Sequence, residues 1–320
     1  MNLEVIRVFH YKEYIYCVYK EKSFTRAAEK LHISQPSLSV AIRKEEEEVG
    51  HPIFNRKTNP ITLTPFGMEY IRSIEQIREL EMQLQNMAFD LHSLQAGTLS
   101  IGASNLNIPH FLPRILAEFK KQYPGVTLQI EDTNTINAKQ LLDSGSLDII
   151  ITNNPYSQTE YEVVPVYREQ LIVAVPASFE INRRFNKLEL TQEDLAKGIF
   201  SVPDKRGVYL KEFGSVPFIL LSTKNYLRTC TDILFQEAGI TPQIVMEFEQ
   251  SSISYNFARY GIGATIFSNR YIEEMDLGAD LKYYKINSAY ATRTGYACYR
   301  KGSYVTTGMR TFLDMLLKAS

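Results

Sequence analysis

The chain has 320 residues and a net charge of −1, and 44% of its residues are hydrophobic and 22% charged. This balance is typical of a globular protein, and the length exceeds what one hydrophobic core usually organises, so two or three domains are expected. The chain contains no apolar run of about eighteen residues and its first segment carries charges, which argues against a membrane span and a signal peptide. We therefore expect a cytoplasmic protein.

Cysteine and histidine usage points away from metal and disulfide chemistry. Cys17, Cys230 and Cys298 are widely separated, and the five histidines are scattered. Neither set has the spacing of a metal site, and isolated cysteines fit a reducing compartment. Dinucleotide, nucleotide-phosphate, zinc-protease and serine-hydrolase motifs are missing as well. We therefore expect no metal, no cofactor and no enzymatic activity.

Three helices are predicted at the N-terminus. The first is amphipathic and covers residues from about 2 to 20. Ser23 and Ser34 belong to the residue types that cap helix N-termini, and each precedes a run with helical apolar spacing. The helix after Ser34 tolerates Pro36 in its first turn and ends at Gly50. Residues 23–39 therefore predict two short helices with a tight turn between them.

Such a helix pair allows two interpretations. It can place its second helix in a DNA major groove, or it can simply pack inside a domain. In the first case Gln35, Ser37 and Ser39 point outward, and a glutamine can pair bidentately with adenine. The candidate DNA-binding residues of the pair are Ser23, Thr25, Arg26, Ser34, Gln35, Pro36, Ser37, Ser39 and Arg43.

Residues 52–64 predict a small β-hairpin. Ile53-Phe54 and the run from Ile61 to Thr64 favour strands, and Asn59-Pro60 is a turn signal between them. By itself the hairpin could be a solvated basic loop. After the helix pair it is better interpreted as a wing whose tip meets the DNA backbone or a minor groove. The candidate residues at the tip are Arg56, Lys57 and Thr58.

The residues of this region carry a family resemblance. The segment Ser-Phe-Thr-Arg-Ala-Ala-Glu-Lys-Leu-His-Ile-Ser-Gln-Pro-Ser-Leu-Ser is followed by Val-Gly, Pro-Ile-Phe-Asn-Arg and Leu-Thr-Pro-Phe-Gly. It resembles the winged helix-turn-helix of LysR-type transcriptional regulators, which implies a DNA-binding domain over residues 1–64. One position departs from that pattern, since most members carry leucine where this chain has Glu45. We expect the acidic run Glu45–Glu48 to be a solvated face turned away from phosphate, although the packing of this helix stays open.

Residues 65–96 predict one long linker helix. Its apolar residues recur at alternating spacings of three and four, which is the seam of a coiled coil. Such a seam either pairs two chains or packs on its own domain, and we expect dimerisation because a helix this long exceeds its small domain. The seam residues are Ile77, Leu80, Leu84, Met87, Leu91 and Leu94.

Beyond Gly97 predicted strands and helices alternate, which indicates a mostly parallel sheet with helices on both faces. Residues 97–320 resemble the effector domain of LysR-type regulators, an architecture similar to periplasmic binding proteins. The resemblance implies two Rossmann-like subdomains, with residues 97–165 and 269–320 in the first and 166–268 in the second. The expected fold class is therefore α+β multidomain, with a winged helix-turn-helix, a long linker helix and an α/β effector domain.

The predicted effector site lies at strand ends. In open α/β sheets ligands bind there, where helix N-termini present N–H groups. The residues at these ends are mostly hydroxyls and amides with one ammonium, which suits a small anion such as a carboxylate. By resemblance Ser104, Thr135 and Thr223 fall where the family contacts its inducer, although each could be an ordinary cap or loop residue. The full set is Ser104, Asn105, Thr133, Thr135, Asn153, Ser222, Thr223 and Lys224.

The expected function is transcriptional regulation by a homodimer or homotetramer. Two paired winged helix-turn-helix domains would read a pseudo-palindromic double-stranded DNA operator. An effector would bias the relative placement of these domains, and hence the bending of the DNA or the regulator's contact with RNA polymerase. The alternative is a solute-binding protein of the periplasmic type whose N-terminal helices only oligomerise. That alternative predicts ligand binding without DNA affinity. An enzyme on this sheet would need a nucleophile and base that the sequence does not offer.

Overall fold

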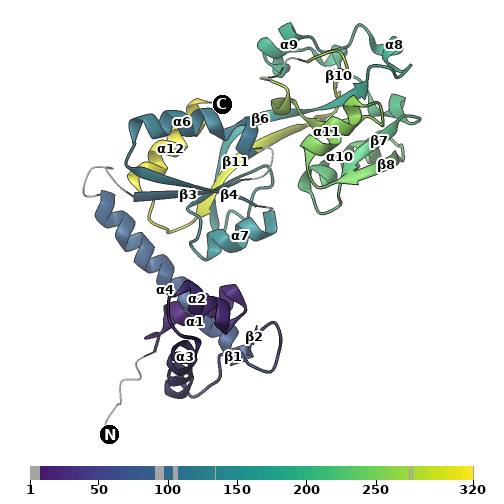
Figure 1. Ribbon diagram of the computed structural model, residues 1–320. Coiled ribbons are helices and arrows are strands. Elements are labelled where there is room, and N and C mark those ends of the chain that lie inside the picture. The colour runs from purple at the N-terminus through teal and green to yellow at the C-terminus, as the bar shows by residue number, and fades with distance from the viewer. Residues whose placement is uncertain are drawn as a thin grey trace. The chain divides into compact units, whose positions relative to one another are not determined.

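The structure is a computed structural model that describes residues 8–90, 97–103, 107–133, 135–273, 275 and 277–319. It divides near Gln85 into two compact units, a smaller N-terminal one and a larger C-terminal one (Figure 1). The mixture of helices and strands agrees with the predicted α+β class. Leu91, Leu94, Ser104 and Asn105 lie outside the described residues.

The N-terminal unit is a helical domain with a small hairpin. Its core takes side chains from every element, among them Ile15, Ala28, Ile42 and Phe54. Alanines on the second helix let the helices approach closely. The elements are α1 (Lys12–Glu21), α2 (Phe24–Lys30), α3 (Gln35–Val49), β1 (Phe54–Asn55), β2 (Thr62–Leu63) and α4 (Pro65–Asp90).

The predicted starts of α2 and α3 are confirmed. The Ser23 hydroxyl accepts a hydrogen bond from the Arg26 amide at 3.4 Å, and the Ser34 hydroxyl accepts one from the Ser37 amide at 3.2 Å. These bonds satisfy amides that have no partner inside a helix. Gly50 ends α3 with a φ of 75°, in the left-handed region that glycine adopts without strain.

The first helix begins later than predicted. Helix α1 starts at Lys12, and residues 8–11 form a turn in which Phe9 has a φ of 71°. The amides of Phe9 and Tyr11 donate to the carboxylate of Glu45, at 2.5 Å and 3.1 Å. The Glu45 carboxylate of α3 therefore accepts hydrogen bonds from backbone amides of this turn, in a segment whose apolar spacing predicts a helix.

Glu45 is also not part of a solvated face, contrary to the prediction. It is 0% exposed and lies on the buried side of α3 with Leu38 and Ile42. A buried carboxylate is stable only when donors surround it. Here the Tyr70 hydroxyl of α4 donates a further hydrogen bond. Burial, together with the bond to Glu45, raises the pKa of the Tyr70 phenol. The turn before α1, α3 and α4 therefore meet at one carboxylate.

Glu46 differs from the next two glutamates of the acidic run in its hydrogen bonds and exposure. One carboxylate oxygen of Glu46 accepts the amides of Ile53 and Phe54 at 2.8 Å and 3.1 Å, and this anchors the first strand of the wing to α3. Glu47 and Glu48 are exposed, as expected for a solvated face.

The C-terminal unit is built on a mixed sheet with the strand order β10-β6-β11-β5-β3-β4, and β9 also pairs with β6. β3 lies parallel to both β4 and β5, whereas β11 is antiparallel to β5 and β6. The strands are β3 (Gly97–Ala103), β4 (Val126–Asp132), β5 (Ile149–Thr152), β6 (Tyr161–Pro176), β9 (Thr265–Ser268), β10 (Leu281–Lys285) and β11 (Thr292–Arg300).

Helices cover both faces of the first part of this sheet, which contains β3, β4 and β5 (Figure 1). Phe119 of α6 and Phe312 of α12 pack together in one core, while Ala138 and Leu142 of α7 belong to another. This is the predicted arrangement of helices on both faces, whereas the sheet is mixed and not mostly parallel as predicted, because β6 pairs antiparallel with β9, β10 and β11. The helices are α5 (Asn107–His110), α6 (Leu112–Gln122), α7 (Thr135–Asp143) and α12 (Thr307–Lys318).

The second part of the unit contains a parallel pair, β7 (Pro217–Leu221) and β8 (Gln243–Phe248). Buried side chains of β7 and of the surrounding helices form its core with the C-terminal half of β6. The helices are α8 (Asn182–Phe185), α9 (Gln192–Ala196), α10 (Tyr226–Glu237) and α11 (Ser251–Arg259), with 3-10 turns η1 (Ile199–Ser201), η2 (Asp204–Arg206), η3 (Leu210–Phe213), η4 (Asn269–Tyr271) and η5 (Ala289–Ala291).

The segment after β9, where the predicted boundary at residue 269 falls, contacts both parts of the unit. Strand β10 pairs with residues 172–176 of β6, and Leu281 and Tyr283 pack in a core of the second part. The Arg270 side chain stacks on Phe111 and Tyr167 of the core that contains Phe119, and Ala297 of β11 packs in the same core. The sequence of residues 281–285 favours a strand through its two tyrosines, but the pairing partner decides to which part the strand belongs.

A buried ion pair lies where β6 and β11 run side by side. Glu169 is 0% exposed, and it accepts hydrogen bonds from the Arg293 guanidinium and, at 2.7 Å, from the Ser268 hydroxyl. Arg293 also donates to the sulfur of Cys230 on α10 at 3.8 Å. Because a buried charge is tolerated only with such partners, these contacts hold β6, β9, β11 and α10 together.

Replacing Glu45 by leucine should lower the free energy of unfolding of the N-terminal unit by about 3 kcal/mol, because the Tyr11 amide and the Tyr70 hydroxyl would lose their acceptor and the Phe9 amide would keep only the Tyr70 oxygen, at 3.1 Å. Urea unfolding of the full chain, followed by far-ultraviolet circular dichroism, measures this loss.

The matched control is Glu48→Leu, which changes an exposed glutamate of the same run and should stay within about 0.5 kcal/mol. Equal stability of Glu45→Leu and the unaltered chain would contradict the role given to this carboxylate.

Candidate nucleic-acid interface and effector site

The face of α3 opposite the core is exposed and holds the predicted base-reading residues. Leu38 and Ile42 point into the core, whereas Gln35, Ser37 and Arg43 are exposed. The N-terminal residues of a recognition helix are the ones that reach base edges. The amide of Gln35 is therefore accessible for pairing with a base.

Several hydroxyls of the candidate set are used inside the fold. The Ser34 and Ser37 hydroxyl oxygens lie 2.7 Å apart, and Ser34 also caps α3. Ser39 is half-buried, and its hydroxyl accepts a hydrogen bond from Arg56 at 3.1 Å. Ser23 caps α2. These contacts position the helices and the wing, and contact of these side chains with DNA stays a prediction.

Three more candidates lie in the first turn of α2 and at the wing tip. Thr25 is exposed in the first turn of α2. Arg26 is exposed too, and its guanidinium donates to the Glu21 carbonyl. The Thr58 hydroxyl accepts the Thr62 amide at 3.1 Å and so closes the wing turn.

The two wing cations differ in their surroundings. The guanidinium of Arg56 donates to Glu46 at 2.8 Å and lies 5.1 Å from the centroid of the Phe24 ring. It is therefore held against the helix pair. Lys57 is exposed at the tip. Of these two, Lys57 is the better placed to reach a phosphate.

The predicted seam of α4 is apolar and exposed where it is described. Ile77 is half-buried, and Leu80, Leu84 and Met87 are 65%, 68% and 42% exposed. Large apolar side chains aligned on one helix face are typical of a surface that another helix covers.

Two predicted effector residues follow neighbouring strands of the first core. The Thr133 amide after β4 donates to the carbonyl of Ala103 at the end of β3, at 3.1 Å. Asn153 follows β5, which is parallel to β3. Its side-chain oxygen accepts a hydrogen bond from the Tyr167 hydroxyl, and its nitrogen donates to the Thr294 carbonyl, both at 3.3 Å. These two residues therefore lie at the same edge of the sheet, and Thr135 begins α7 next to that edge.

The other predicted effector residues form the loop between β7 and α10. The Ser222 amide donates to the Phe248 carbonyl at 2.8 Å, which fixes the loop to β8. The Ser222 hydroxyl is buried and has no hydrogen-bond partner among the described residues. Thr223 and Lys224 are exposed, and Asn225 caps α10. A buried hydroxyl beside the start of a 12-residue helix suits a bound anion.

A cation that the sequence did not predict lies near Asn153. The guanidinium of Arg270 stacks on the rings of Tyr167 and Phe111, at 4.3 Å and 4.9 Å from their centroids. Its Nε atom is buried and, within the part of the chain that the structure covers, has no hydrogen-bond partner. A sequence pattern could not find this residue, because stacking depends on segments that are far apart along the chain.

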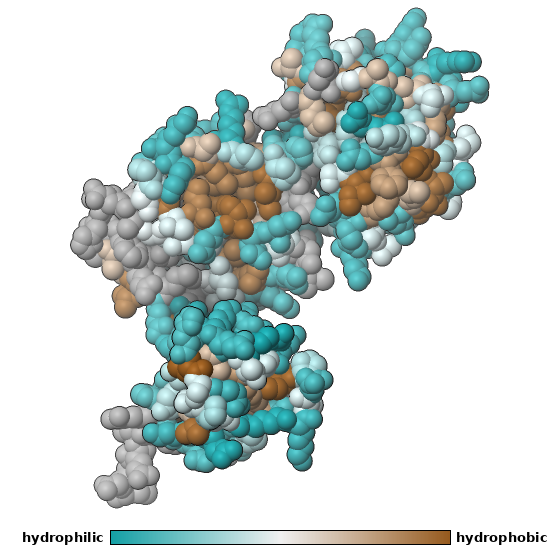
Figure 2. Space-filling view, viewed as in Figure 1, coloured by the Kyte–Doolittle hydropathy of each residue, from teal (hydrophilic) through white to brown (hydrophobic). Residues whose placement is uncertain are grey.

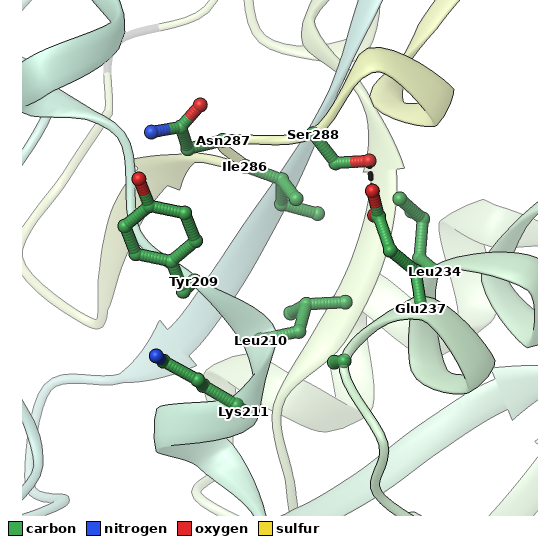
Figure 3. Close-up of a pocket in the computed structure, with 9 residues that line it drawn as sticks. Tyr209, Leu210, Lys211, Leu234, Glu237, Ile286, Asn287 and Ser288 are labelled. Carbon is green, nitrogen blue, oxygen red and sulfur yellow. Dashed lines mark hydrogen bonds between the residues drawn. The ribbon is translucent and has the colours of Figure 1, made fainter.

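A small pocket of about 190 Å³ lies between η3, the end of α10 and the segment after β10. Figure 3 shows Tyr209 and Lys211 on one side and the hydrogen-bonded Glu237 and Ser288 on the other. It is smaller than the roughly 300–1,000 Å³ of most ligand pockets. None of the predicted effector residues lines it, and we assign it no ligand.

The described residues contain neither a membrane-spanning helix nor a metal-binding cluster. Among them, no helix is both long and apolar enough to cross a lipid bilayer. No group of at least three histidine, cysteine, aspartate or glutamate side chains in the same residues could hold a metal ion.

Solved structures show the same fold. CbnR in complex with its target DNA has a TM-score of 0.69 and 19% identity, with 98% of this chain and 100% of that chain covered. A full-length OxyR variant from Pseudomonas aeruginosa has a TM-score of 0.66 and 22% identity, with 97% of each chain covered.

Curated relatives are transcriptional regulators. YcgK of Bacillus subtilis, an uncharacterised regulator of the helix-turn-helix type, is 28% identical over 312 residues, which cover 95% of this chain and 92% of the relative. The RuBisCO operon transcriptional regulator of Allochromatium vinosum is 26% identical over 321 residues, covering 99% and 96%.

Two family models together match most of the chain. Residues 11–68 match the bacterial regulatory helix-turn-helix proteins of the lysR family, and residues 92–320 match the LysR substrate binding domain. The first match is not expected of a solute-binding protein, so that alternative is not favoured. The chain therefore belongs to the LysR family of DNA-binding transcriptional regulators.

Proposed function

We propose that this regulator binds a pseudo-palindromic operator as a homodimer or homotetramer and responds to a small anionic effector. The observation that carries the DNA-reading part is the exposed face of α3, where Gln35 and Arg43 are accessible while Leu38 and Ile42 anchor the helix in the core. One such helix per half-site would enter the major groove. Lys57 would contact the flanking backbone.

The anionic nature of the effector is supported by two separate features. The buried hydroxyl of Ser222 lies beside the N-terminus of α10, where backbone amides favour a negative charge. The cation of Arg270 stacks on Tyr167, which is the hydrogen-bond partner of Asn153. We propose that a carboxylate is recognised by these groups together with Thr133, Thr135, Thr223 and Lys224, and that Ser104 and Asn105 belong to the same site.

Oligomerisation is supported by apolar surface in both units. The seam residues Leu80 and Leu84 are exposed on α4. In the C-terminal unit Ile244 and Val245 of β8 and Ile253 of α11 are each between 37% and 40% exposed. Figure 2 shows an apolar area in this region of the visible face. Surfaces of this kind are typical of contacts between subunits.

Regulation would follow from differential binding. An effector changes transcription only if it binds one arrangement of the regulator better than another. The arrangement that it favours would alter the path of the bound DNA or a contact with RNA polymerase, in the cytoplasm where both are found. No catalytic step is part of this proposal.

Replacing Gln35 by alanine should weaken binding to an operator selected from random DNA by about tenfold to a hundredfold, with little change on unrelated DNA. Lys57→Ala should instead weaken binding to all DNA. It should also lower the magnitude of the slope of log affinity against log salt concentration by about one for each DNA-binding domain. Fluorescence anisotropy at several salt concentrations separates the two effects. Lys211→Ala removes an exposed charge of the C-terminal unit and serves as control. Unchanged operator affinity of Gln35→Ala would remove α3 from the DNA site.

The double substitution Leu80→Lys/Leu84→Lys should at least halve the mass of the assembly in sedimentation velocity, because two like charges would face each other across the seam. Met68→Lys/Arg72→Lys places the same residue type on exposed positions of α4 away from the seam and should leave the mass unchanged. If the seam variant sediments like the unaltered chain, α4 does not hold subunits together.

At least one member of a panel of small mono- and dicarboxylates should raise the melting temperature of the full chain increasingly as its concentration rises above the Kd. Ser222→Ala should weaken that carboxylate about tenfold, since a hydrogen bond to a charged group is lost. Isothermal titration calorimetry measures the change. Ser201→Ala removes a hydroxyl that bonds the Gly198 carbonyl and is the control. Equal affinity of Ser222→Ala and the unaltered chain would exclude Ser222 from the site.

A further inference from the structure

An apolar side chain stands on the exposed face of α3. Val40 is 66% exposed, and it is not among the residues predicted to contact DNA. Residues three and four positions apart lie on the same side of a helix. Val40 therefore shares a stripe with Pro36, Arg43 and Lys44, all of which are exposed.

Exposure of one apolar residue has no meaning by itself, because such residues are common on protein surfaces. The surroundings of Val40 are what distinguish it. The cores of protein interfaces are depleted in charge, whereas Val40 lies on the same side of α3 as the cations Arg43 and Lys44, and Gln35 is exposed in the first turn of the same helix. This combination of a basic stripe, an amide and an apolar spot suits the major groove of DNA better than another protein.

The major groove offers one apolar group on the base edges, the C5-methyl of thymine. A valine in a helix is held almost entirely in one rotamer, so its methyl groups keep a fixed direction. The Pro36 ring lies one turn before Val40 on the same side and widens the apolar spot.

We propose that Val40, with Pro36 beside it, contacts a thymine methyl in each half-site and so makes a T·A pair a requirement there. This specificity rests on the proposed function, because it assumes that α3 enters the major groove. Since Gln35 is suited to adenine, both contacts select A·T pairs, and the part of the half-site under the first turns of α3 should be rich in them.

The test replaces each thymine of the selected operator in turn by deoxyuridine, which removes the methyl group and leaves every hydrogen-bonding atom in place. At one thymine per half-site the unaltered chain should bind the uracil site about fourfold more weakly, which corresponds to one buried methyl group. Substituting both half-sites together should multiply the two effects.

Variants then connect that position to Val40. Val40→Ala should bind the thymine site more weakly and should no longer distinguish thymine from uracil, whereas Val40→Ile should keep the distinction. Met68→Ala is the control, because Met68 is also a large exposed apolar residue of the N-terminal unit, at 54%, but lies on α4. Its preference for thymine should equal that of the unaltered chain. Circular dichroism and sedimentation of each variant show that fold and assembly are retained.

The binding measurements separate failure of the methyl contact from failure of the proposed function. Indifference of the unaltered chain to uracil at every thymine, with specific binding intact, would overturn the methyl contact and leave the proposed function standing. A thymine preference that persists in Val40→Ala would assign the methyl contact to another residue and overturn the proposal. A change of assembly mass in Val40→Ala would identify Val40 as a protein contact instead. If no DNA sequence is selected at all, the proposed function itself fails.

Discussion

The geometry of the N-terminal unit depends on one buried carboxylate. Glu45 belongs to the helix that also carries Gln35 and Val40, and its oxygens accept hydrogen bonds from the turn before α1 and from Tyr70 of α4. An unpartnered carboxylate in an apolar core would be strongly destabilising, so these elements must meet at this point. The direction in which α3 presents its exposed face is therefore fixed by an interaction on its buried face. Glu46 extends the same principle to the wing, whose first strand it holds through two amides.

A buried ion pair has a comparable role in the C-terminal unit. The two parts of this unit share β6, and the pairing of β6 with β11 and β9 is reinforced by the buried Glu169–Arg293 pair. Arg293 also contacts Cys230 on α10, the helix that begins next to Ser222. A ligand at the Ser222 loop would therefore act on a helix that is tied to the crossing strands. This continuity gives an effector a physical route to the rest of the unit, provided that the ligand binds one arrangement better than another.

The sequence predicted the features that depend on neighbouring residues. Ser23 and Ser34 cap their helices as expected, because a cap needs only the amides of the next turn. Glu45 differs from the prediction, since four consecutive glutamates suggest a solvated face, whereas its helical phase with Leu38 and Ile42 indicates burial. The place of β10 and the stacking of Arg270 could not be predicted, because both depend on partners more than a hundred residues away along the chain. The candidate effector residues shared this difficulty, and local pattern placed them only at strand ends.

The central claim is that paired α3 helices read DNA sequence. Selection of binding sites from random duplex DNA by the full-length chain tests it most directly. We predict enriched sequences with two inverted half-sites whose centres lie about one helical turn, or a multiple of it, apart. Each half-site should contain A·T pairs where Gln35 and Val40 reach the groove. Failure to enrich any sequence, or enrichment of a single motif without an inverted repeat, would contradict the account.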